Sequence, residues 1–151
     1  MARLKHIIEE ELVYFITTTT RGRQELFLNG SLTEILLSVL KELRECQSCE
    51  IYAFVIMPDH LHLIIKPNEL SLPGIMKKLK GKSARLINQS LKASGPVWQE
   101  RYYEHAIRDE GDFQRKVQYV LYNPVTAGLS KEPEEYPYSS AHRSELVDPI
   151  A

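Results

Sequence analysis

Two histidines stand one residue apart in an apolar stretch, His60 and His62 of the segment MPDHLHLIIKP (residues 57–67). Successive side chains of a β-strand point to opposite faces, so the two imidazoles would share one face of a sheet. Neighbouring imidazoles can bind one metal ion or one phosphate group. The alternative is a pair of half-buried histidines that hydrogen-bond backbone carbonyls, and the pair alone leaves both interpretations open.

A tyrosine and an asparagine lie four residues apart in EGDFQRKVQYVLYN, at Tyr119 and Asn123. Tyr119 falls on nearly the opposite side of this predicted helix from its apolar stripe, and Asn123 is its neighbour one turn later. The stripe consists of Phe113, Val117, Val120 and Leu121. Alone, Tyr119 is most simply a surface residue. Two imidazoles and an amide oxygen can, however, hold a divalent cation, and a tyrosine hydroxyl beside that cation is a candidate nucleophile.

Positive charge is concentrated in one segment without acidic residues, from Ser71 to Gln99, although the whole chain has a formal net charge of −1. A solvated helix face would normally mix in glutamates, so this segment is predicted to contact phosphates. The candidate DNA-binding residues are Lys77, Lys78, Lys80, Lys82 and Arg85. Arg101, interleaved with Trp98, Tyr102 and Tyr103, gives a weaker indication of base stacking.

Hydrophobic periodicity predicts the elements that position these residues. Strands are predicted at residues 11–20, 50–57, 60–67 and 97–108. Helices are predicted from Ser31 to Cys46 with Glu34 at the capping-box spacing, over residues 71–93, and from Asp109 to a stop at Pro124 and Gly128. This order predicts an α+β fold: a ferredoxin-like antiparallel sheet (βαββαβ) with an added C-terminal helix that carries the candidate catalytic tyrosine.

The 151 residues suit a single domain, 1–151, with an irregular tail over residues 130–151. No apolar run approaches the roughly 20 residues that span a membrane, and acidic residues occupy the place of a signal peptide's apolar core. We therefore expect a cytoplasmic protein without a membrane partner. Cys46 and Cys49 form a CxxC pair without two further zinc ligands nearby, which favours ordinary thiols.

Three stretches together resemble the HUH-type single-tyrosine transposases, most closely the REP-associated tyrosine transposase branch. IMPDHLHLIIKP resembles the family's histidine-hydrophobic-histidine strand, YVLYNPVTAGL its Tyr-x-x-x-Asn helix end, and VWQERYYEHAIRDE the strand that leads into that helix. The match covers residues 12 to 142, most of the chain. The histidine motif followed by the tyrosine–asparagine motif is a fairly specific combination.

The resemblance implies a role for each matching residue. His60 and His62 correspond to the metal-binding histidines, Asn123 to the third ligand and Tyr119 to the nucleophile. The implied activity is metal-dependent cleavage and strand transfer of single-stranded or hairpin DNA through a covalent 5′-phosphotyrosine, as in DNA transposition. The expected cofactor is Mg²⁺ or Mn²⁺, and the expected assembly is a monomer or a homodimer. Asp59 stands where relatives often carry asparagine and receives no chemical role.

The sequence allows two main alternative functions and two more distant ones. One is a non-cleaving protein that only binds REP-like hairpins, although the catalytic residue types are all present. The other is a histidine-triad nucleotide hydrolase, but Ile64 stands where the third histidine of that motif should be. A barrel metallohydrolase would need roughly 250 residues, and rolling-circle replication initiators usually carry further domains.

Overall fold

The computed structural model describes residues 2–10 and 12–149. Within these ranges the elements are α1 (Ala2–Glu9), β1 (Tyr14–Thr19), α2 (Gly30–Glu45), β2 (Cys49–Met57), β3 (His60–Pro67), α3 (Leu72–Leu91), β4 (Tyr103–Ala106) and α4 (Glu110–Thr126). The strands form one antiparallel sheet in the order β2-β3-β1-β4. The predicted α+β, ferredoxin-like architecture is confirmed.

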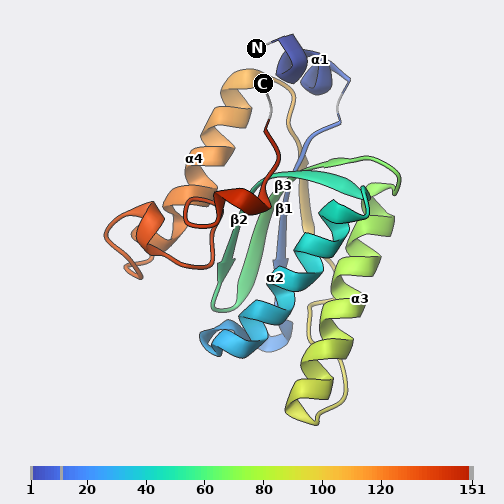
Figure 1. Ribbon diagram of the computed structural model, residues 1–151, viewed down its shortest axis with the longest axis vertical. Helices are drawn as coiled ribbons and strands as arrows, with labels where there is room; N and C mark the ends of the chain where they lie inside the picture. The colour runs from blue at the N-terminus through green and yellow to red at the C-terminus, as the bar shows by residue number, and fades with distance from the viewer. Residues whose placement is uncertain (1, 11, 150–151) are drawn as a thin grey trace.

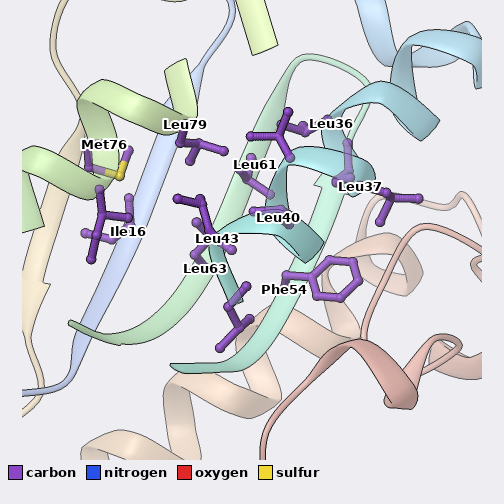
Figure 2. Close-up of a cluster of buried hydrophobic side chains, with 14 of the residues drawn as sticks. Ile16, Leu36, Leu37, Leu40, Leu43, Phe54, Leu61, Leu63, Met76 and Leu79 are labelled. Atoms are coloured by element: carbon purple, nitrogen blue, oxygen red, sulfur yellow. The ribbon is translucent and has the colours of Figure 1, made fainter. Parts of the chain in front are cut away.

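Each face of the sheet has its own hydrophobic core because the strand side chains alternate. Leu61 and Leu63 of β3 face α2 and α3, which lie side by side over one face (Figures 1 and 2). Ile64, with Phe15 of β1, faces the other side, which α4 covers, and α1 packs against α4 in the same core (Figure 1). His62 belongs to this second face. The histidine pair and the basic helix α3 therefore lie on opposite sides of the sheet.

The β2–β3 hairpin turns through Pro58 and Asp59, as the sequence predicts, and pairs Met57 with His60. The backbone carbonyl of Asp59 accepts hydrogen bonds from the backbone N–H of Thr20 (2.9 Å) and from its hydroxyl (3.1 Å). The carbonyl of Pro58 accepts from the backbone N–H of Phe27 (3.0 Å). These bonds fix the turn against the loop that follows β1, and so they fix the start of the histidine strand.

Several element boundaries differ from the prediction. Helix α2 begins at Gly30, and Asn29 rather than Ser31 caps it: the Asn29 side chain accepts from the Ser31 backbone N–H. Helix α4 continues through Pro124 to Thr126, although proline removes one backbone donor near the end of the helix. Helix α1 was not predicted.

The predicted fourth strand, residues 97–108, is much shorter in the structure. Only Tyr103–Ala106 pair with β1, and Trp98 forms an isolated bridge to Thr20. Trp98 is buried, packs against Phe27 with ring centroids 5.6 Å apart, and donates to Ser83 Oγ of α3 (2.9 Å). The Arg21 N–H still donates to the Val97 carbonyl (2.8 Å) and the Gln99 N–H to the Thr19 carbonyl (2.9 Å), so the segment leaves the ladder only at residues 100–102.

The predicted irregular tail is ordered against the edge of β2 over its described residues, to position 149. Ser139 bridges to Val55, and Ser140 Oγ accepts from the backbone N–H of Phe54 (3.0 Å). Asp148 Oδ2 accepts from the backbone N–H of Ile51 (2.9 Å). Positions 150–151 of the tail, and position 11 of the predicted first strand, lie outside the described residues. None of the described helices is long and apolar enough to cross a membrane.

Candidate functional site

The four candidate catalytic and metal-binding residues line one cavity of about 400 Å³ between the sheet and α4. His60 and His62 come from β3, and Tyr119 and Asn123 from α4. The prediction that the two imidazoles share a face holds, since their ring centroids lie 4.6 Å apart. The cavity is completed by Thr17, Thr19, Arg23, Met57, Thr126 and Ala127.

His62 is a buried, neutral imidazole with one free nitrogen. Its Nδ1 lies 2.8 Å from the hydroxyl of Thr17, its partner across the β1–β3 ladder. Its Nε2 is buried without a hydrogen-bond partner in the described part of the chain. Burial, with a smaller contribution from the charge of His60, lowers the pKa of His62 to about 3. The ring is therefore in the form that can donate an electron pair.

His60 is oriented by a neighbouring carboxylate. Its Nδ1 lies 2.6 Å from Asp59 Oδ1, while the other carboxylate oxygen accepts from Arg23 Nε (3.2 Å). Burial tends to raise the pKa of Asp59, but the hydrogen bonds and charges of His60 and Arg23 outweigh it and hold that pKa below its usual value. An ionised carboxylate behind one ring nitrogen directs the other nitrogen into the cavity, as in many metal-binding histidines.

Tyr119 lies over the sheet rather than pointing away from it. Its ring meets the rings of His62 and Phe15 edge-on, with centroids 5.3 and 5.9 Å away. It is nevertheless 53% exposed, so its hydroxyl is accessible to a large substrate. The helical argument placed Tyr119 correctly beside Asn123, but the expectation that it turns away from the core is wrong. Tyr122 is also exposed and lies outside the residues that line this cavity.

The donor set suits a hard or borderline divalent cation. Two imidazoles and the Asn123 amide line the cavity, and one ring nitrogen, His62 Nε2, is buried without a partner among the described residues. Among the described residues, no cluster of three or more His, Cys, Asp or Glu side chains could hold a metal ion. A site formed from the cavity residues would thus combine His60, His62 and Asn123 and leave coordination positions open.

A second cavity of about 600 Å³ adjoins the first and shares Thr17, His62 and Tyr119 with it. Its remaining lining residues are Phe15 of β1, Tyr103 of β4, and Arg115 and Lys116 of α4. Arg115 and Lys116 were not predicted as site residues, and neither was Arg23 of the first cavity. Lys116, Tyr119 and Asn123 stand at helical spacing i, i+3 and i+7, so the sequence could have placed Lys116 on the same helix face as the two predicted site residues.

The predicted basic residues of α3 lie away from this site, on the α2 side of the sheet. Lys77, Lys78, Lys82 and Arg85 line a groove between α2 and α3 together with Glu42. Lys82 forms a short ion pair with Glu42, so α2 supplies the acidic partner that α3 lacks.

The two remaining predicted DNA-binding residues are Lys80 and Arg101, and both are associated with the segment before β4. Lys80 Nζ donates to the backbone carbonyls of Gln99 (2.6 Å) and Glu100 (3.0 Å), which ties α3 to the segment before β4. Arg101 is exposed in that same segment. Of the predicted stacking aromatics, Trp98 belongs to the core, and Tyr103 lines the second cavity.

Both motifs of this site fall within a recognised protein family. Residues 9–123 match the family model described as "Transposase IS200 like". The chain is 30% identical over 132 residues to the REP-associated tyrosine transposase of Escherichia coli K12, across 86% of this chain and 76% of that protein. It is 28% identical over 76 residues to the ISDra2 transposase TnpA of Deinococcus radiodurans, across 50% of this chain and 54% of that protein.

The fold leads to the same group of proteins. A solved structure of a REP-associated tyrosine transposase bound to a REP hairpin superposes with a TM-score of 0.73 at 26% identity, covering 91% of this chain and 82% of that one. The matched region includes the histidine strand and extends to Asn123 on α4. The resemblance noted from the motifs is confirmed: the chain belongs to the IS200-like transposase family, in its REP-associated tyrosine transposase branch.

Proposed function

We propose that this transposase cleaves single-stranded DNA beside hairpin elements and transfers the cut strand through a covalent 5′-phosphotyrosine on Tyr119. The observation that carries the proposal is the convergence of Tyr119, His60, His62 and Asn123 on one cavity. The relative that was solved with a REP hairpin supports a hairpin as the DNA partner.

In the proposed reaction the Tyr119 oxygen attacks the scissile phosphorus. A bond forms between this oxygen and the phosphorus, the bond to the 3′ oxygen breaks, and the departing strand ends in a 3′-OH. The phenol loses its proton and the leaving oxygen gains one, so the exchange of one ester for another balances and needs no external energy source. A 3′-OH that attacks the phosphotyrosine then reverses the step and completes strand transfer.

The surrounding residues hold the substrate and the ring. Tyr119 packs edge-on against His62 and Phe15, which limits the positions of its hydroxyl. Arg23, on the rim of the cavity, is a cation placed to contact a phosphate. Mg²⁺ or Mn²⁺ is the proposed cofactor, held by His60, His62 and Asn123; when bound, such an ion polarises a phosphoryl oxygen and stabilises developing negative charge.

The test uses end-labelled oligonucleotides that carry hairpins from the chain's own genomic neighbourhood, incubated with Mg²⁺ or Mn²⁺. A 5′-phosphotyrosine retains the strand on the 3′ side of the cut, so a 3′ label should move with the denatured protein. A 5′ label should appear on a shortened free strand. Binding of the hairpin without either product would instead favour a protein that binds hairpins without cleaving them.

A further inference from the structure

The second cavity shares Thr17, His62 and Tyr119 with the proposed catalytic cavity, and its other lining residues include Tyr103, Arg115 and Lys116, which have no role in the proposed chemistry. We propose that this cavity binds one unpaired DNA base, that of the nucleotide adjoining the scissile phosphate. This inference rests on the proposed function, because it assigns a subsite to the same DNA substrate.

The cavity has an aromatic floor with aromatic walls. Phe15 is almost fully buried and forms the floor. The rings of Tyr103 and Tyr119 stand at 70° and 80° to the Phe15 ring, with centroids 6.2 and 5.9 Å away. Both tyrosines are more than half exposed. Exposed rings around a recess provide stacking surfaces for a planar base, and stacking accepts any base because each has a π-face.

The rim of the cavity is positively charged. Lys116 Nζ lies 5.8 Å from the centre of the Phe15 ring and 3.2 Å from Asp112 Oδ1. Arg115 lines the same cavity and its side chain is 69% exposed. The nearby Asp112 carboxylate is also engaged by His105 Nε2 at 2.7 Å, so it does not face the cavity as a free anion. The rim therefore suits a phosphate attached to the base.

The position of the cavity selects its occupant. It shares Thr17, His62 and Tyr119 with the proposed catalytic cavity, so a strand whose phosphate reaches Tyr119 places an adjoining base within reach of the aromatic recess. A volume of about 600 Å³ falls in the range of small-molecule sites. A base paired in a duplex has both faces covered by its neighbours, so only an unpaired base could enter. A protein side chain would use the aromatic rings but not the cationic rim.

The experiment measures binding of a single-stranded oligonucleotide with a hairpin and unpaired flanks. The full-length Tyr119→Phe variant is used, since it keeps the ring and cannot be consumed by covalent attachment. An abasic residue is moved through the flanks one position at a time. We expect one flank position, next to the cleavage position mapped with the wild type, to weaken binding by about 5- to 150-fold, the range of a lost base stack.

Matched variants test whether the weaker binding at the abasic position arises in the second cavity. Added to Tyr119→Phe, Tyr103→Ala should weaken binding of the intact oligonucleotide and remove the penalty of the abasic position, whereas Tyr103→Phe should retain both. Tyr122→Ala alters an exposed tyrosine of α4 that does not line the cavity and should change neither. Arg115→Ala should weaken all the oligonucleotides equally and flatten the salt dependence.

The outcomes separate this inference from the proposed function. If the wild type binds and cleaves but no flank position is sensitive to base removal, the subsite is wrong and the proposed function stands. The same holds if the abasic penalty persists in Tyr103→Ala. If the intact hairpin is neither bound nor cleaved, the proposed function fails and the subsite fails with it.

Discussion

The ring of Tyr119 stands edge-on to the ring of His62, with centroids 5.3 Å apart and an interplanar angle of 68°. One residue comes from the middle of α4 and the other from a buried central strand, so the contact joins the two layers that form the site. The Thr17 hydroxyl, 2.8 Å from His62 Nδ1, restrains the same ring. A nucleophile fixed in this way depends on the packing of α4 against the sheet.

The carboxylate of Asp59 should control metal affinity through His60. Asp59→Ala removes the acceptor 2.6 Å from His60 Nδ1, so the ring loses its orientation and part of its basicity. We expect affinity for Mn²⁺, measured by calorimetry without DNA, to fall by roughly 10- to 100-fold. Asp59→Asn keeps an acceptor oxygen and should lose less. Equal affinities in all three proteins would show that Asp59 does not position a metal ligand.

Lys77, Lys78 and Arg85 of α3 are predicted to contact phosphates of the DNA. The triple variant Lys77→Ala, Lys78→Ala, Arg85→Ala should lower affinity for hairpin DNA and reduce the slope of log affinity against log salt by about 0.7–0.9 per lost phosphate contact. The control is Lys80→Ala, because Lys80 binds the carbonyls of Gln99 and Glu100 and should affect stability instead. An unchanged salt slope in the triple variant would place the DNA path elsewhere.

The sequence could predict those features of the site that depend on residues close together in the chain. Strand alternation placed His60 and His62 on one face, and helical spacing paired Tyr119 with Asn123, since both follow from local geometry. Helix α1 carried a usable signal as well, in the spacing of Leu4, Ile7 and Ile8.

The failures concern contacts between distant segments. Helical spacing relates Lys116 to Tyr119 and Asn123, but only the packing of α4 on the sheet brings Arg115 and Lys116 beside Phe15. Likewise the acid-free run of α3 suggested an open basic face, but Glu42 of α2 pairs with Lys82. Trp98 was expected in a strand but forms only an isolated bridge, and its ring packs against Phe27 and donates to Ser83 of α3.

The two cysteines should differ sharply in reactivity. Cys46 is exposed, whereas Cys49 is buried, and that burial, with the nearby charges of Asp148 and Glu50, raises the pKa of the Cys49 thiol to about 12. At pH 8 Cys49 therefore has almost no thiolate. Iodoacetamide should add one group to the native protein and two in denaturant, counted by mass spectrometry. Rapid double labelling of the native protein would contradict the buried position of Cys49.

The tail should stabilise the sheet through Asp148. Its carboxylate accepts from the Ile51 backbone N–H (2.9 Å) and from Arg44 Nε (3.0 Å). Asp148→Ala leaves that backbone donor unpaired, and we expect the free energy of unfolding in urea to fall by about 1–3 kcal/mol. Asp148→Asn keeps an acceptor for Ile51 and should lose less. Identical unfolding midpoints and slopes for all three proteins would show that the tail contributes nothing measurable to stability.

The most direct test of the account is covalent adduct formation by Tyr119→Phe beside Tyr122→Phe, each with a 3′-labelled hairpin oligonucleotide and divalent metal. Tyr119→Phe removes one oxygen and keeps the ring, so folding and hairpin affinity should change little while the adduct and the cleaved strand disappear together. Tyr122→Phe should form the adduct as the wild type does, because Tyr122 does not line the catalytic cavity. An adduct that persists in Tyr119→Phe and is lost in Tyr122→Phe would contradict the assignment of the nucleophile.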